Sequence, residues 1–204
     1  MSRLHRYLVK GRLEAGCDEA GRGCLAGPVF AAAVVLRPRM RLPGIDDSKK
    51  LTAERREELR DLIEQQSLTW AVARVDPHEI DRINILNASF KAMHLAIDKL
   101  DPRPEMLLID GNRFHPYPGI PAQCIVQGDG KFAAIAAASI LAKTYRDDYM
   151  RSLHSEYPEY DWENNVGYPT EAHREGIRLA GTTEHHRTSF RLLPDPQLSL
   201  FDHA

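Results

Sequence analysis

Four acidic residues lie beside short apolar segments or turns, where a folded chain would hold their carboxylates rigidly. They are Asp18 and Glu19 after the run 13–17, Asp110 at the end of the run 105–110, and Asp129 in a Gly-Asp-Gly turn. Ends of buried strands direct side chains to one edge of a sheet, so we expect the four to gather there. In a chain with 29 acidic residues, chance explains any one of these placements better than it explains all four.

A cluster of carboxylates suits hard divalent cations such as Mg²⁺ or Mn²⁺, which prefer oxygen ligands. Two such ions roughly 4 Å apart can clamp the attacking and leaving oxygens of a phosphoryl displacement. Without metal, the crowded charges would raise the pKa of one or more of the carboxyls. The chain shows no Ser-His-Asp spacing and no candidate cysteine nucleophile, so the pattern favours metal-assisted phosphodiester hydrolysis.

The segment Gly21-Arg22-Gly23 directly follows the first acidic pair. Glycine has no Cβ, so the backbone here could approach a ligand closely and meet sugar hydroxyls. A plain turn is the alternative for this segment taken alone.

Apolar periodicity and turn signals predict the elements that position these residues. Strands are expected over 13–17, 28–36, 68–75, 105–110 and 122–126. Helices are expected over 53–66 with Thr52 as cap, from Asp76-Pro77 onward, along a stripe from Leu86 to Leu100, from Phe132 to about Tyr157, and from Thr170 to Gly181. This order predicts a mixed α/β fold with a helical C-terminal part.

The composition, with 43% hydrophobic and 27% charged residues among 204, is that of a globular protein. We expect one domain over 1–190 and a loosely held tail over 191–204. The chain shows no apolar run long enough for a membrane span, no apolar stretch of a signal peptide, and three cysteines, too few for a disulfide framework. A reduced, cytoplasmic protein is therefore expected. The net charge of −2 argues against coating nucleic acid by bulk charge, though not against a local site.

Several separate motifs, in order from about Leu13 to Phe190, resemble those of ribonuclease HII, the type 2 ribonuclease H family. They are DEAGRGCLAGPVFAAAVVL at 18–36, DDSKKL at 46–51, LLIDGN at 107–112, QGDGKFAAIAAASILAKTYRD at 127–147, NVGYPTEAH at 165–173 and HRTSF at 186–190. The resemblance implies a ribonuclease H-like mixed sheet flanked by helices. It also implies an endonuclease that hydrolyses RNA paired with DNA and cuts 5′ of single ribonucleotides in duplex DNA, leaving a 3′-hydroxyl and a 5′-phosphate.

The family's carboxylates fall on Asp18, Glu19, Asp110 and Asp129, the residues already selected, and would bind two ions, Mn²⁺ or Mg²⁺. The backbone of Gly21, Arg22 and Gly23 is expected to read the ribonucleotide 2′-hydroxyl, the group that distinguishes RNA from DNA. Tyr168 is expected to stack beneath the following sugar; alone, it would be taken for a half-buried core tyrosine.

Lys49, Lys143 and Arg146 lie in matched segments, where they could hold backbone phosphates or belong to a solvated helix face. Asp147 and Asp148 are interpreted as structural or surface residues. His173, His185 and His186 are interpreted as structural rather than as a general base. The sequence departs from the family pattern at Cys24, in place of proline, and at Gln127 and Gly130, which predict a looser turn around Asp129.

The segment Gln197–Phe201 (QLSLF) resembles the peptide by which bacterial proteins dock on the DNA polymerase sliding clamp; packing of these residues on the domain is the alternative. A monomer is expected. Two other functions remain open: a metal-dependent DNA nuclease of the same fold, and a non-catalytic hybrid-binding module. Four acidic residues facing a phosphate argue against the second.

Overall fold

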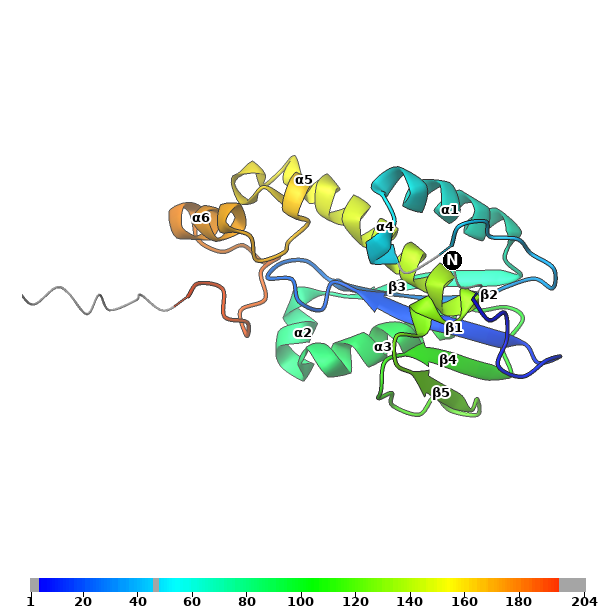
Figure 1. Cartoon of the computed structure of the whole chain (residues 1–204). Coiled ribbons are helices and arrows are strands. Elements are labelled where there is room, and N and C mark those ends of the chain that lie inside the picture. Colours follow the sequence, from blue (N-terminus) through cyan, green and yellow to red (C-terminus); the bar gives the residue numbers. More distant parts are fainter. Residues whose placement is uncertain (1–3, 46–47, 195–204) are drawn as a thin grey trace, which may run out of the picture.

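The structure, a computed structural model, describes residues 4–45 and 48–194. Its centre is a five-stranded sheet in the order β3-β2-β1-β4-β5 (Figure 1). The strands are β1 (Glu14–Ala20), β2 (Val29–Val35), β3 (Thr69–Val75), β4 (Met106–Asp110) and β5 (Ala122–Ile125). β1 pairs with β2 in antiparallel and with β4 in parallel orientation, so the sheet is mixed, as predicted.

Helices cover both faces of this sheet (Figure 1). α1 (Ala53–Gln66) and α4 (Ala133–His154) lie on one face, α2 (Pro77–Ile83) and α3 (Ile85–Ile97) on the other. α5 (Trp162–Asn165) and α6 (Glu171–Ala180) lie beyond the C-terminal end of α4, with 3-10 turns at Ser48–Lys50, Gly128–Gly130 and Pro158–Tyr160. The predicted mixed α/β fold with a helical C-terminal part is confirmed.

The alanine-rich start of α4 lies directly against β1. A Cβ on Gly16 would come within 2.2 Å of the backbone carbon of Ala134, so only glycine permits this approach. Alanines 136, 137 and 138 are fully buried beside it. The close packing holds the helix at a fixed height above the strands that carry the acidic residues.

The structure differs from the sequence prediction at two places that matter for the site. β1 continues past the apolar run, because β2 supplies backbone partners for Asp18 (opposite Ala32) and Glu19 (opposite Ala31). The two acidic residues therefore lie within the strand rather than after it. α5 was not predicted, because four residues are too few to show a periodicity.

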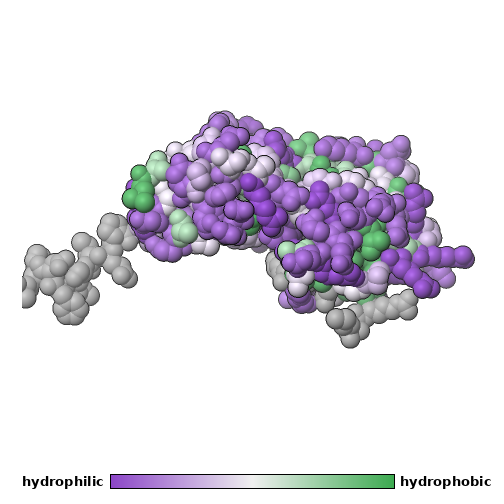
Figure 2. All heavy atoms as spheres, turned by 90° about the horizontal axis from the view of Figure 1, so that it is seen from above, coloured by the Kyte–Doolittle hydropathy of each residue, from purple (hydrophilic) through white to green (hydrophobic). Residues whose placement is uncertain are grey.

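Within the described residues, no helix is long and apolar enough to cross a membrane. The face seen in Figure 2 is mainly hydrophilic, with hydrophobic residues in small separate groups.

Candidate active site

Asp18 and Asp110 are neighbours on the parallel strands β1 and β4. Cys17 is in register with Ile109, so the next residue of each strand stands side by side at the end of the pairing. Side chains alternate along a strand. Because Gly16 meets α4 and Leu108 packs with Ile135 of α4, Asp18 and Asp110 point to that same face.

The surroundings of Asp18 disfavour its charged form. The side chain is buried, and burial raises its pKa well above the ordinary value, with further contributions from the charges of Glu19 and Asp110. Hydrogen bonds from Ser139 and from the Glu19 amide oppose the shift. The repulsion expected from the sequence is therefore present.

Glu19 points to the opposite face, toward α3. It lines a small hollow together with Phe90, Asp110 and Asn112, and its Oε1 lies 3.2 Å from Nη1 of Arg22. Acidic side chains therefore lie on both faces of the sheet, with Asp18 and Asp110 toward α4 and Glu19 toward α3.

Asp129 is held close to the others by its turn. Oδ1 of Asp110 accepts a 2.7 Å hydrogen bond from the amide of Gly128, which ties the 128–130 turn to β4. Oδ1 of Asp129 accepts a 2.8 Å bond from the amide of Gly130. Gln127 begins the turn with a φ of 55°. The turn is thus fixed by main-chain contacts in spite of the departures at Gln127 and Gly130.

Each of these carboxylates has a partner within the protein, an amide for Asp18, Asp110 and Asp129 and Arg22 for Glu19. In the described part of the chain, no group of three or more acidic, histidine or cysteine side chains is placed to hold a metal ion as it stands. The donor chemistry nevertheless fits hard divalent cations, and a bound cation would offset the burial and the neighbouring charges of Glu19 and Asp110 that raise the pKa of Asp18. Each amide hydrogen bond occupies one carboxylate oxygen of Asp18, Asp110 and Asp129, so the second oxygen of each remains for an ion.

The Gly21-Arg22-Gly23 loop rests on a buried side chain. Gly21 has a φ of +94°, and a Cβ there would lie 2.0 Å from Nε of Arg146. At Gly23 a Cβ would meet no heavy atom within 4 Å. Gly21 is therefore required by packing from beneath, whereas Gly23 leaves its backbone open to the outside.

Arg146 does not have the expected surface position. It is 1% exposed, and Nε, Nη1 and Nη2 donate to the carbonyls of Pro28 (3.2 Å), Val166 (2.8 Å) and Ala26 (3.1 Å). With its guanidinium turned inward, the side chain has no access to a phosphate in this structure. Arg146 instead joins the segment 26–28 to Val166 behind the site, so the phosphate contact expected from the sequence is wrong. The sequence places Arg146 near Lys143 on the helix but does not reveal that the loops cover it.

Arg187 was assigned no role from the sequence, although it lies in the matched HRTSF segment. It is 0% exposed and donates from Nε to Gly27 (2.9 Å) and from Nη1 to Arg22 (3.0 Å). Burial, and then the charge of Arg146, lowers its pKa to about 10. Two buried arginines, Arg146 and Arg187, therefore lie behind the Gly21-Arg22-Gly23 loop (the glycine loop).

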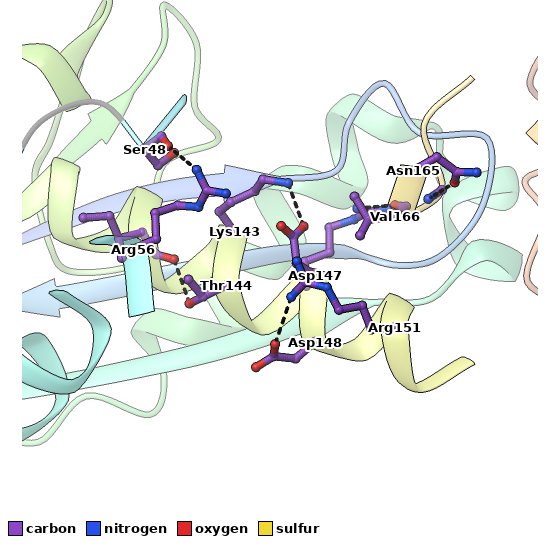
Figure 3. A network of polar contacts seen from close by, with 12 residues as sticks. Ser48, Arg56, Lys143, Thr144, Asp147, Asp148, Arg151, Asn165 and Val166 are labelled. Carbon is purple, nitrogen blue, oxygen red and sulfur yellow. Dashed lines mark hydrogen bonds and ion pairs between the residues drawn. The ribbon is translucent and has the colours of Figure 1, made fainter. Parts of the chain in front are cut away.

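Lys143 and Tyr168 lie on the open side of the site. Nζ of Lys143 forms a 2.7 Å ion pair with the buried Asp147 (Figure 3) and lies 5.6 Å from the centre of the Tyr168 ring, which is 38% exposed. Asp148 pairs with Arg60, so both aspartates engage other side chains of the protein. The Lys49 side chain and the segment Gln197–Phe201 lie outside the described residues.

Ribonucleases H are among the solved structures that share this fold. Ribonuclease H2 from Pyrococcus horikoshii matches with a TM-score of 0.73 and 26% identity, over 88% of this chain and 94% of that one. The RNase HII in a PCNA complex from Archaeoglobus fulgidus matches with a TM-score of 0.75 and 27% identity, over 91% and 98%. These likenesses, together with the acidic residues at the ends of adjacent strands, place the chain in the ribonuclease H class of nucleases.

The sequence comparisons are more specific. The family model described as Ribonuclease HII matches residues 15–193. Ribonuclease HII of Bacteroides thetaiotaomicron is 60% identical over 194 residues, 95% of this chain and 97% of the relative. That of Porphyromonas gingivalis is 55% identical over 192 residues, 94% and 96%. The chain belongs to the ribonuclease HII family, and it is an endoribonuclease that acts on RNA–DNA hybrids.

Proposed function

We propose that this endonuclease also cuts duplex DNA on the 5′ side of a single embedded ribonucleotide, with Asp18, Glu19, Asp110 and Asp129 as ligands of two divalent ions, Mn²⁺ or Mg²⁺. The observation that carries the proposal is the side-by-side placement of Asp18 and Asp110, with Glu19 and the 128–130 turn adjoining them.

Two divalent ions, when bound, supply a water of lowered pKa and neutralise the charge that develops on the phosphate. The protein's part is to hold four oxygen donors on a rigid strand end and turn. Hydrogen bonds donated by the Glu19, Gly128 and Gly130 amides keep the carboxylates of Asp18, Asp110 and Asp129 in place before the ions arrive.

The open backbone at Gly23 and the half-exposed ring of Tyr168 support selection of the sugar. The loop is fixed from behind by Arg146 and Arg187, so its peptide groups can face the 2′-hydroxyl without rearrangement. Tyr168 supplies a flat surface for the next sugar. Lys49 and Lys143 are proposed to hold backbone phosphates, which position the duplex; Lys143 would share its charge between a phosphate and Asp147.

The test uses duplex DNA that carries one ribonucleotide, an all-DNA duplex and a long RNA–DNA hybrid, each with Mn²⁺, Mg²⁺ or chelator. We expect one cut 5′ of the ribonucleotide, none in the all-DNA duplex and none with chelator. Asp110→Asn should abolish cleavage and keep the fold, because the amide oxygen still accepts from Gly128. Cleavage of the hybrid alone would refute the sugar-reading assignments, and near-normal turnover of Asp110→Asn would refute its role as a ligand.

The same experiment separates the two other functions. Equal cutting of the all-DNA duplex would indicate a DNA nuclease of this fold. Binding of the hybrid without any cleavage would indicate a non-catalytic hybrid-binding module.

We also propose that the segment Gln197–Phe201 docks on a sliding clamp. The support is its sequence, QLSLF, which has apolar residues to fill a groove, together with the PCNA complex formed by the archaeal RNase HII of the same fold. We also propose that the protein is a monomer located in the cytoplasm. Its catalytic domain would span 1–190 and its tail 191–204.

A further inference from the structure

The ring of Tyr168 faces outward, but its main-chain carbonyl is held by buried rings behind it. Nδ1 of His173 lies 2.9 Å from the Tyr168 carbonyl oxygen. Nε2 of His173 lies 3.0 Å from Nε1 of Trp162 and 3.2 Å from Nε2 of His186. Trp162, His173 and His186 are all buried. The two histidines are therefore structural, as expected, and they are also linked to the residue proposed to contact the sugar.

The hydrogen-bond donors around His173 and His186 determine which nitrogen of each ring carries the proton. The indole of Trp162 can only donate, so Nε2 of His173 accepts and the ring proton of neutral His173 sits on Nδ1, where it donates to Tyr168. The amide of Thr183 donates to Nδ1 of His186 at 3.0 Å, so the His186 proton sits on Nε2 and points to His173. Each ring nitrogen then has a partner.

An extra proton on His173 would break this arrangement, because it would sit on Nε2 and face the N–H groups of Trp162 and His186. On His186 it would sit on Nδ1, where it would face the Thr183 amide and would have the Thr183 hydroxyl, 3.1 Å away, as its acceptor. Burial lowers the pKa of both histidines, that of His186 to about 4. Both rings are therefore neutral at neutral pH, and His173 keeps the tautomer that donates to Tyr168.

The residues just before Tyr168 are fixed as well. The carbonyl of Val166 accepts from Arg146, and the carbonyl of Gly167 accepts from the Leu25 amide at 2.8 Å. A Cβ on Gly167 would lie 2.6 Å from the Ala26 carbonyl oxygen, so this segment is pressed against the loop that follows Gly23. His173 thus completes a set of contacts that hold Tyr168 in register with the glycine loop.

We propose that His173 is a positioning residue for Tyr168, held in the required tautomer by His186 and Trp162, and that it contributes to the selection of a ribonucleotide junction. The inference rests on the proposed role of Tyr168. The measured quantity is the selectivity ratio, defined as the initial rate on duplex DNA with one ribonucleotide divided by the rate on a long RNA–DNA hybrid. Both substrates use the same carboxylates, so effects on the metal centre cancel.

Two substitutions of His173 separate positioning from packing. In His173→Asn the amide nitrogen stands where Nδ1 stood and can still donate to the Tyr168 carbonyl. In His173→Gln the amide reaches the Nε2 position, where it can accept from Trp162 but leaves Tyr168 without that donor. We expect His173→Asn to keep the selectivity ratio within about twofold and His173→Gln to lower it about fivefold to tenfold, the effect of losing one hydrogen bond.

His154→Gln is the matched control, because His154 contacts Glu163 rather than the buried rings; its ratio should equal that of the unaltered protein. Thermal unfolding of every variant checks that the fold is kept at the assay temperature. Equal ratios in His173→Asn and His173→Gln would show a packing role and overturn the inference.

Tyr168→Ala tests the proposed contact of Tyr168 with the sugar, on which the role of His173 depends. A lowered ratio in Tyr168→Ala with an unchanged ratio in His173→Gln would overturn the positioning role of His173 and leave the role of Tyr168 standing. An unchanged ratio in Tyr168→Ala would overturn both.

Discussion

Arg146 lies directly beneath Gly21, at a distance that leaves no room for a side chain at position 21. The same guanidinium bonds to the carbonyl of Val166, two residues before Tyr168. One buried arginine therefore sets the spacing between the glycine loop and the tyrosine segment, the two elements proposed to read the sugar.

Gly21→Ala should destabilise the protein by about 2–4 kcal/mol, because the new Cβ meets Arg146 and the backbone has a positive φ. Urea unfolding measures the change. Gly23→Ala is the matched control, since its Cβ meets nothing, and it should cost less than about 1 kcal/mol. Similar losses in the two variants would contradict the packing explanation.

Arg146→Lys should cost about 3 kcal/mol of folding free energy, because an ammonium cannot reach the carbonyls of Pro28, Ala26 and Val166 together. Denaturant titration measures it. Arg178→Lys on α6, where Arg178 pairs with Glu171 and Glu175 in solvent, should leave the free energy of unfolding almost unchanged. A negligible loss of stability in Arg146→Lys would contradict the buried hydrogen bonds and would favour the exposed position expected from the sequence.

Asp18→Asn should abolish cleavage yet raise the melting temperature in chelator. The raised pKa of Asp18 means that burial and the charges of Glu19 and Asp110 disfavour its ionised form in the folded state, so removing the charge stabilises the metal-free protein. Scanning calorimetry with and without Mn²⁺ measures both effects. The ion should stabilise the unaltered protein more than the variant, and an equal gain in both would argue against Asp18 as a ligand.

Acid should weaken the fold through the buried histidines. The pKa of His186 falls from its ordinary 6.5 to about 4 on folding, so below pH 6.5 the unfolded chain takes up a proton that the folded chain excludes. Stability is therefore lost as pH drops from 6.5 toward 4, by at most about 3 kcal/mol from this residue. Urea unfolding at several pH values in that range measures the free energy of unfolding as a function of pH. In His186→Asn this free energy should fall less steeply with pH than in the unaltered protein, and an equal pH dependence would mean that His186 does not titrate there.

Deletion of residues 196–204 should abolish retention on immobilised sliding clamp and leave cleavage of a ribonucleotide-containing duplex unchanged, because the carboxylates lie on β1, β4 and the 128–130 turn. Pull-down with purified clamp measures the binding. Substitution of Leu198 and Phe201 together by serine should have the same effect, and retention equal to that of the full chain would refute the docking proposal.

The strands, most of the helices and the four acidic residues could be predicted from the sequence, because local apolar periodicity, caps and turns encode them. Thr52 and Thr170 cap their helices through their side chains, as the sequence predicts. Asp18, Glu19, Asp110 and Asp129 could be selected because each lies next to a recognisable apolar element or turn.

Which polar side chains are buried could not be predicted from the sequence, because it depends on contacts between distant segments. The sequence favours an accessible position for Arg146 and assigns no role to Arg187, yet loops from distant parts of the chain enclose both and accept their hydrogen bonds. The link from His186 through His173 to Tyr168 joins residues up to 18 positions apart, and no periodicity reveals it. Burial and hydrogen-bond partners depend on how elements pack, which local sequence patterns do not specify.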